Sequence, residues 1–434
     1  MKKKVNKYIV FAIGAFFLGS LFPTAYSGVD TGLEQLKVLV DVMQRVQENY
    51  VEETQPSGLI TGAMQGMVGT LDEFSEYITP EEMRRMREDT RGEFGGVGLK
   101  LVMPSRGVLL VTTPMPDTPS YKAGIEPGDI ILKIDGKAVA DMQHSEAVDL
   151  LRGAVGKSVK VEIERKDAKT GKTINKTFSL KRENIVPQVV YSKMLEDKIG
   201  YVYVTDFSGH TMADFEKALE TLKKQGMQAL IVDLRFNPGG LLSSAVEMAK
   251  LFIGDNQMIV YTKGRKEEFY KEYRSGAKAK YADLPVAILV NEGSASGSEI
   301  VAGAFQDYQR GVLLGSLTFG KGSVQQVIGL PNEGGLRITV AKYYTPQGRS
   351  IHKNFKAQNP NSTGGIVPDI SVPFDVQNAR KATFYTTNLI YSPSKKTIVP
   401  DGAPVEDPVL NRALEILKAR GVLASLKPQP QEAR

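Results

Sequence analysis

Short, strongly apolar runs alternate with amphipathic stretches in the second half of the chain. Three runs of almost purely aliphatic or aromatic side chains predict buried strands at residues 200–204, 229–234 and 286–290. Between them, apolar positions spaced by three or four residues predict helices at 213–225 and 242–252. Strands that alternate with helices predict an α/β layered fold, whose functional site lies in the loops at the carboxyl ends of the strands.

The region before these strands has a different, helical pattern from residue 30 to about residue 90. Its apolar stripe has three- and four-residue steps: Leu33, Leu36, Val40, Met43 and Val46. A second helix is expected at 59–68, and Thr79 before Pro80 is typical of an N-cap with proline at the first helical position. The stripe fits either a core face or a contact with a second copy of the chain. One more amphipathic helix is expected near the C-terminus, at 408–420.

Short strands and Gly/Pro turns replace the helices from about residue 93. The expected strands include 108–111, 158–165 and 176–181, with a helix at 145–152. The glycine-rich loop at 95–98 exposes successive backbone N–H groups, which can hold a terminal carboxylate. The strand beside it offers an unpaired edge to an incoming peptide.

The N-terminus has the pattern of an export signal. A cationic segment at 1–7 precedes an apolar run at 8–22, and Ala25 and Ser27 supply small residues before Gly28. Counted through Tyr26, the run approaches the length of a membrane-spanning helix, so an uncleaved membrane anchor is the alternative. We therefore expect the body of the protein to work outside the cytoplasm, in the periplasm or cell-envelope space.

Composition removes several classes of function. The 434 residues contain no Cys, which excludes disulfides, thiolate metal sites and cysteine nucleophiles, and only three His, which argues against a histidine-rich metal site. The formal charge of +6 includes the lysines at positions 2, 3, 4 and 7 of the N-terminal segment. The rest of the chain has no basic run with interleaved aromatics, so nucleic acid is not an expected partner.

Candidate chemistry is concentrated in three loops of small and polar residues, at 233–240, 291–300 and 317–326. The second loop places a serine where the chain turns into a helix, whose free N–H groups could stabilise an oxyanion. A serine at a helix start is also a common cap. A serine nucleophile needs a base, and Lys321, flanked by glycines, can serve if burial keeps its amine neutral. Gln325 lies four residues further on and could orient that amine.

Three other interpretations of these loops remain open. Lys321 could be an exposed loop ammonium, the default for a lysine, or His352 could be the base, although it has no evident orienting acid. Residues 315–321 satisfy the first part of a phosphate-binding loop, but Gly322 stands where Ser or Thr must hold magnesium, and the following residues predict a strand. We expect no nucleotide, metal or other cofactor.

Together the three loops resemble the C-terminal processing peptidases, tail-specific serine proteases with a Ser/Lys dyad. The matching runs are DLRFNPGG (233–240), GSASGSEIVAGA (293–304) and TFGKGSVQ (318–325), supported by YYTPQGRSI (343–351) and GIVPDI (365–370). Residues 71–77 resemble the family's N-terminal motif, with Glu73 in place of the usual Pro. The resemblance spans roughly residues 35–375.

The resemblance implies a role for each matching residue. Ser296 is the implied nucleophile, Lys321, at the family's usual spacing from it, the base, and Gln325 the orienting residue. The implied oxyanion hole uses the amide of Gly297, where Ala is common in the family, and an amide from the Gly239–Gly240 turn. Ser294 and Ser298 are expected to be caps or hydrogen-bonding neighbours.

Residues 93–184 resemble a PDZ domain, most specifically in the run AGIEPGDIILKIDGKAV (123–139). This implies that a peptide C-terminus docks between a strand at Gly96–Leu99 and the 145–152 helix. The peptide would contact Gly96, Val97, Gly98 and Leu99. Arg152, at the end of that helix, could report tail occupancy to the peptidase domain, or it could simply be a cation favoured at a helix C-terminus.

These inferences predict an α/β peptidase core with an inserted β-rich PDZ domain and an N-terminal helical region. The expected limits are 1–27 for the signal or anchor, 28–92, 93–184, 185–375 for the core, and 376–434 for a C-terminal extension. The expected function is an exported serine endopeptidase that acts on the C-terminal tails of exported or misfolded proteins and could self-associate through its N- or C-terminal helices. The alternatives are a catalytically inactive PDZ scaffold or chaperone, and a crotonase-like acyl-transfer enzyme, for which no coenzyme A site is evident.

Overall fold

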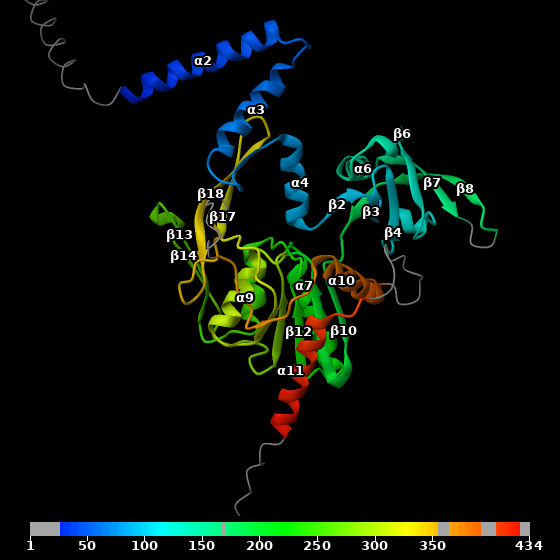
Figure 1. Cartoon of the computed structure of the whole chain (residues 1–434), viewed down its shortest axis with the longest axis vertical. Coiled ribbons are helices and arrows are strands. Elements are labelled where there is room, and N and C mark those ends of the chain that lie inside the picture. The colour runs from blue at the N-terminus through cyan, green and yellow to red at the C-terminus, as the bar shows by residue number, and fades with distance from the viewer. Residues whose placement is uncertain (1–26, 167–169, 355–363, 392–404, 426–434) are drawn as a thin grey trace, which may run out of the picture. The chain divides into compact units, whose positions relative to one another are not determined.

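The computed structural model describes residues 27–166, 170–354, 364–391 and 405–425 (Figure 1). Residues 1–26, which hold almost all of the expected signal or anchor, lie outside the described part. The chain divides into two compact units, residues 1–71 and 72–434.

The described residues of the first unit form two helices, α2 (Ser27–Asn49) and α3 (Pro56–Gly69). The expected apolar stripe is present on α2, and Leu33, Leu36 and Val40 each expose more than half of their surface. A cleft of about 370 Å³ between the two helices is lined entirely by apolar side chains.

The second unit begins with a short strand, β1 (Glu76–Ile78), followed by helix α4 (Pro80–Arg91). Thr79 caps α4 as expected: its hydroxyl accepts the N–H of Glu82, and the carboxylate of Glu82 accepts the N–H of Thr79 at 2.9 Å. The expectation of a helical region through residue 90 is wrong at β1, because this segment pairs with residues 335–337, far away in the sequence.

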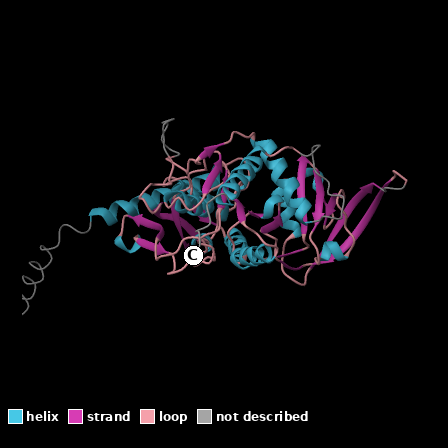
Figure 2. Cartoon of the chain, turned by 90° about the horizontal axis from the view of Figure 1, so that it is seen from below, coloured by secondary structure: helices cyan, strands magenta, loops and turns pink. Residues whose placement is uncertain are grey.

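A five-stranded antiparallel path in the order β3-β4-β5-β7-β8 forms the β-rich module. Its strands are β3 (Leu99–Ser105), β4 (Val108–Pro114), β5 (Ile130–Ile134), β7 (Ser158–Lys166) and β8 (Thr173–Lys181), with β6 (Lys137–Ala138) paired to β5. Its helices are α5 (Pro119–Lys122), the single-turn η1 (Val139–Asp141) and α6 (His144–Leu151). Figure 2 shows the long β7–β8 hairpin at its right-hand end.

The strand expected at 96–99 is wrong. β2 (Phe94–Gly96) pairs with β9 (Glu183–Ile185), and Val97 and Gly98 form a turn before β3. Gly98 has φ +76°, and a Cβ there would lie 2.3 Å from Thr118, so this position requires glycine. Val97 and Gly98 separate two short strands where the PDZ resemblance implied one.

The central sheet of the peptidase core has the order β10-β11-β12-β15-β16-β19. Its strands are β10 (Val190–Met194), β11 (Ile199–Val204), β12 (Ala229–Asp233), β15 (Val286–Val290), β16 (Val312–Gly315) and β19 (Ile370–Ser371). Only β10 is antiparallel to its neighbour among these described strands. The α/β class and the three buried strands are therefore confirmed.

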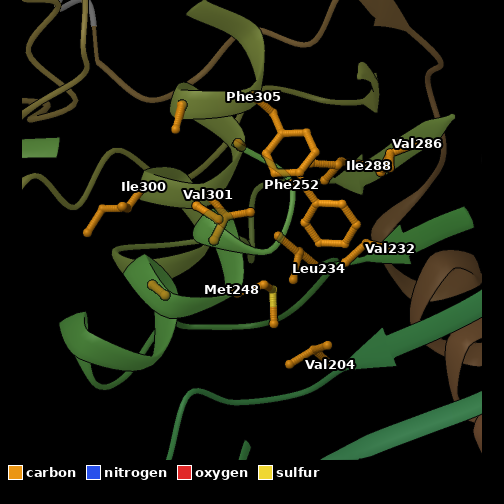
Figure 3. Close-up of a cluster of buried hydrophobic side chains, with 14 of the residues drawn as sticks. Val204, Val232, Leu234, Met248, Phe252, Val286, Ile288, Ile300, Val301 and Phe305 are labelled. Carbon is orange, nitrogen blue, oxygen red and sulfur yellow. The ribbon is translucent and has the colours of Figure 1, made fainter. Parts of the chain in front are cut away.

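Helices cover both faces of this sheet, which explains why its strands are apolar throughout. Leu230 and Val232 of β12 pack with α7 (Thr211–Lys224), α8 (Leu242–Lys250) and α9 (Gly297–Asp307), in the cluster that Figure 3 shows around Phe252 and Phe305. Ile231 faces the other side, against α11 (Pro408–Ser425). The remaining helices of the described residues are α10 (Val376–Tyr391), which the sequence pattern did not predict, and the short η2 (Glu196–Lys198) and η3 (Glu267–Phe269).

A second, smaller sheet in the order β1-β18-β13-β14 lies beside the core, with β17 paired to β18. Its strands are β13 (Met258–Gly264), β14 (Lys271–Arg274), β17 (Ser323–Gly329) and β18 (Gly335–Tyr344), together with β1. β17 is the strand expected after Gly322. It begins directly after the Lys321–Gly322 pair, so this sheet positions the lysine loop.

A buried ion-pair network attaches α11 to the end of β12. The fully buried guanidinium of Arg235 contacts the carboxylate of Asp233 at 2.6 Å and that of Asp407 at 2.8 Å. Asp407 also accepts the N–H of Leu410 in the first turn of α11. The C-terminal helix is thus part of the folded core, bonded to the loop that follows β12.

Candidate active site

The three candidate loops follow three neighbouring parallel strands. Residues 234–241 follow β12, residues 291–296 follow β15, and residues 316–322 follow β16. The carboxyl ends of parallel strands meet at one edge of a sheet, so the topology brings these loops together as expected.

Ser296 occupies a strained backbone position directly before α9. Its φ of +51° and ψ of −109° lie in a region that non-glycine residues rarely adopt. The loop after β12 approaches it closely: a Cβ on Gly239 would lie 2.7 Å from the Cβ of Ser296 and 2.8 Å from the nitrogen of Gly297. Only glycine fits at 239, so the backbone of this loop forms one wall beside the serine.

Glu299, in the first turn of α9, connects the serine loop to the lysine loop. One carboxylate oxygen accepts the N–H groups of Ser296 at 2.8 Å and Lys321 at 2.9 Å. The other oxygen accepts the hydroxyl of Thr318 at 2.6 Å and the N–H of Gly320 at 2.7 Å. The side chain is completely buried. Sequence reasoning missed this residue, although the spacing S-x-x-E from Ser296 to Glu299 is the signal of a capping box.

Burial raises the pKa of Glu299, and the hydrogen bonds from Thr318, Gly320, Ser296 and Lys321 oppose that shift. An ionised carboxylate only accepts hydrogen bonds, and all four groups around this one are donors. The contacts therefore match the ionised form.

Lys321 is half-buried rather than an exposed loop ammonium. Burial lowers the pKa of its amine, the positive charge of Arg337 lowers it further, and Glu76 and Glu299 act in the opposite direction. Its Nζ lies 5.2 Å from the centre of the Phe74 ring. Among the described residues, no hydrogen bond joins the Lys321 amine to the Ser296 hydroxyl.

Gln325 and His352 also meet Phe74. The side-chain amide of Gln325 donates to the carbonyl oxygen of Phe74. The ring of His352 packs edge-on against the Phe74 ring, with 6.5 Å between the two ring centres. Burial lowers the pKa of the imidazole. Its buried Nδ1 has no hydrogen-bond partner in the described part of the chain, so no acid orients it. Lys321 and Gln325 thus converge on one side of the site, as their spacing predicts, but the residue they meet there is Phe74.

The glycine amides differ in their availability. The N–H of Gly239 donates to the side-chain oxygen of Asn237 at 2.9 Å. Neither Gly240 nor Gly297 has an acceptor for its backbone N–H within the described residues, so these two amides are open to an oxyanion. Ser294 and Ser298 are completely buried and donate to the carbonyls of Leu234 and Asn237, the neighbouring role expected for them.

The β-rich module contains a separate apolar cavity of about 280 Å³ between its glycine-rich turn and α6. Its lining includes Val97, Leu99, Leu101, Met115, Val148 and Leu151. The carbonyl of Gly98 is turned away, because it accepts hydrogen bonds from the hydroxyl of Ser120 at 2.7 Å and from the N–H of Met115 at 2.8 Å. The N–H groups of Val97 and Gly98 have no acceptor among the described residues. The glycine pattern predicts a carboxylate site at these amides, which lie at the edge of the apolar cavity.

Arg152 lies at the C-cap of α6 and lines the same cavity. Its guanidinium is 4.1 Å from the centre of the Phe94 ring in β2 and 3.4 Å from the carboxylate of Asp89 in α4. These contacts join the cavity to α4 and β2.

An α/β core with a serine at a strained strand-to-helix turn, together with a β-rich module that has an apolar cavity beside open N–H groups, defines a serine peptidase with a peptide-binding domain. Family comparison agrees: the model for peptidase family S41 matches residues 198–372, and the model for the PDZ domain matches residues 110–165.

Curated relatives match most of the chain or nearly all of it. The carboxy-terminal-processing protease of Bartonella bacilliformis is 34% identical, with 99% of each chain covered. The carboxy-terminal processing protease CtpA of Bacillus subtilis is 35% identical, with 80% of this chain and 73% of the relative covered. The chain belongs to the C-terminal processing proteases of peptidase family S41, which are serine-type proteases.

Two solved structures are similar as well. The photosystem II D1 C-terminal processing protease is 28% identical with a TM-score of 0.45, covering 78% of this chain and 94% of that one. A putative S41 protease from Bacteroides fragilis is 18% identical with a TM-score of 0.50, covering 86% and 92%. The second similarity concerns the fold alone.

Proposed function

We propose that this protein is an exported serine endopeptidase that captures protein C-terminal tails in its PDZ domain and cleaves with Ser296 and Lys321. The observation that carries the proposal is the Glu299 carboxylate, one oxygen of which accepts the backbone N–H of both residues. This contact keeps the two loops adjacent through their backbones and engages neither side chain.

In the proposed reaction the neutral Lys321 amine takes the proton of the Ser296 hydroxyl as that oxygen attacks a peptide carbonyl. The tetrahedral oxyanion is held by backbone N–H groups, Gly297 with one from Gly239–Gly240, and each such donor contributes about 3 kcal/mol in a serine protease. The intermediate collapses to an acyl-enzyme as Lys321 returns the proton to the leaving amine. Lys321 then deprotonates the water that releases the product. Gln325 orients the amine without adding charge.

The test is product analysis by mass spectrometry after incubation with an unfolded test protein. Ser296→Ala should abolish cleavage, and Lys321→Arg should be nearly as damaging because Arg remains charged. Lys342→Arg, an exposed position on β18, is the matched control and should retain wild-type turnover. Cleavage by Ser296→Ala near the wild-type rate would overturn the proposal.

Tail capture is supported by the PDZ match and by the open N–H groups of Val97 and Gly98, with Gly96 and Leu99 on either side. A peptide with a free C-terminal carboxylate should bind, and its C-terminal amide should bind at least tenfold more weakly. Val148→Glu places a negative charge in the cavity, which repels the peptide carboxylate, and should also weaken binding of the free-carboxylate peptide. Glu146→Gln, exposed on the same helix, should not. Equal affinity for the acid and the amide would contradict carboxylate capture.

Arg152 is proposed to couple the tail cavity to the peptidase site, because it lines that cavity and also contacts Asp89. Arg152→Ala should reduce the ratio of cleavage with tail to cleavage without tail. An unchanged ratio would leave Arg152 as a helix-terminal cation only.

The missing hydrogen bond between the Ser296 hydroxyl and the Lys321 amine in the described structure favours a second candidate, an inactive tail-binding scaffold or chaperone. The two candidates separate in one assay, since the scaffold binds a free-carboxylate peptide without cutting any substrate.

Export and assembly complete the proposal. The limits of the five segments stated above, the periplasmic or cell-envelope location and the signal or anchor role of residues 1–27 are proposed from the sequence pattern. In the described ranges we find no helix with the length and apolarity needed to cross a bilayer.

Self-association is proposed through the exposed stripe of α2, since α11 buries Val409, Ala413 and Leu417 against its own core. Sedimentation of the wild type and Leu36→Asp should distinguish dimer from monomer.

A further inference from the structure

Residues 72–75 form a tight turn that is fastened to β18. The carboxylate of Asp72 accepts the N–H groups of Phe74 at 2.8 Å and Ser75 at 2.7 Å, and the Ser75 hydroxyl at 3.0 Å. The same hydroxyl accepts the N–H of Thr339 in β18 at 3.1 Å. This chain of hydrogen bonds, continued by the pairing of β1 with β18, fixes where the Phe74 side chain lies.

Phe74 contacts both residues proposed to provide the base. Its ring lies under the Lys321 amine, with 5.2 Å between Nζ and the ring centre. Its carbonyl oxygen accepts the side-chain amide of Gln325. The ring therefore engages Lys321 while the backbone engages Gln325, and Ser296 is bonded to neither side chain in the described structure.

An aromatic face attracts an ammonium through its quadrupole but offers no such attraction to a neutral amine. The contact consequently favours the protonated form of Lys321, which cannot take a proton from serine. It also holds the amine on the Phe74 side of the loop. Both effects oppose catalysis.

We propose that Phe74 is a positioning residue that stores Lys321 as an ammonium away from Ser296, so that the amine must leave the Phe74 ring before the dyad forms. The inference rests on the proposed function, because it concerns when that dyad can act. It makes the contact between Phe74 and Lys321 the control point of the active site.

Other charged groups face Lys321 from the surrounding elements and remain in every Phe74 variant. They are Arg337 on β18, Glu76 on β1 and Glu299 on α9. His352, which packs edge-on against the Phe74 ring, feels the charge of Lys342. Phe74→Leu keeps apolar cover over the amine and removes the aromatic face, together with the ring contact to His352. A difference between Phe74→Leu and the wild type therefore reports the effect of the aromatic ring on the amine, and not that of burial or of neighbouring charges.

The first measurement is the pH dependence of acetylation of Lys321, read from the mass spectrum of its peptide, which needs no protease activity. In Phe74→Leu the fraction of neutral amine at pH 7 should rise about two- to fivefold, the range of an ordinary cation–π contact. Cleavage of a tail-free substrate at pH 7 should rise by a similar factor. Phe74→Tyr, which keeps the ring, should behave as the wild type.

Phe269→Leu, the same exchange at another half-buried phenylalanine outside the site, is the control and should change neither quantity. If Phe74→Leu is unfolded by circular dichroism, Phe74→Met removes the ring with similar volume. Unchanged labelling of Lys321 together with lower cleavage would overturn the inference, because Phe74 would then only support the fold. A labelling shift with no cleavage in any variant, wild type included, would uphold the contact and contradict the proposed function instead.

Discussion

Replacing Glu299 by Gln should separate the serine loop from the lysine loop. The carboxylate accepts four hydrogen bonds, two on each oxygen. Gln retains one oxygen, so either the N–H groups of Ser296 and Lys321 or the donors of Thr318 and Gly320 must face an NH₂ group that cannot accept. The variant therefore breaks two buried hydrogen bonds without changing the size of the side chain.

A buried donor left without an acceptor costs about 1–3 kcal/mol. Two such donors give a loss of about 2–6 kcal/mol, and relief from burying a carboxylate offsets part of it. We expect the free energy of unfolding of the core to fall by about 2–4 kcal/mol, measured by urea unfolding. Cleavage of an unfolded test protein should fall at least tenfold, because Ser296 and Lys321 lose their shared acceptor.

Glu292→Gln is the matched control. Glu292 is exposed on the same loop, and its one hydrogen bond within the described structure comes from the hydroxyl of Ser316. Its replacement should change stability by less than about 0.5 kcal/mol. If Glu299→Gln unfolds and cleaves like this control, the carboxylate does not hold the two loops and the reasoning is refuted.

Two further predictions concern charge. Since the base must be neutral, the rate of cleavage should rise with pH through the pKa of Lys321. Arg337 lowers that pKa, so Arg337→Gln should move the rise to higher pH. Glu76 raises the pKa, so Glu76→Gln should move the rise to lower pH. Shifts of the same sign in both variants would contradict the assignment of Lys321. Asp407→Asn weakens the buried contact to Arg235 and should lower the free energy of unfolding in urea by about 1–3 kcal/mol. It should also make α11 susceptible to limited proteolysis. An unchanged urea midpoint would show that the network does not hold this helix.

The position of the site could be predicted from the sequence, because short-range patterns decide it. Aliphatic runs at 229–234 and 286–290 identify buried parallel strands, and parallel strands place their following loops at one edge. The turn at Ser296 follows from small residues before an apolar helix. Thr79 likewise caps its helix as the local sequence indicates.

The details within the site depend on contacts that no local pattern contains. Phe74 meets Gln325 across 251 positions of sequence, through pairing of β1 with β18. In the sequence, Glu299 has the pattern of an ordinary helix cap. Its contacts with the loop after β16 become visible only in the folded structure. The strand expected at 96–99 is wrong for a local reason, since the positive φ of Gly98 interrupts an extended pattern.

The most direct test of the central claim is to identify the residue that becomes acylated during turnover. The protein would be mixed with an activated ester substrate, quenched in acid within seconds, digested and mapped by mass spectrometry. The account predicts an acyl group on Ser296 that is absent from Ser296→Ala and strongly reduced in Lys321→Arg. An acyl group on another residue, or equal labelling in Lys321→Arg, would contradict it.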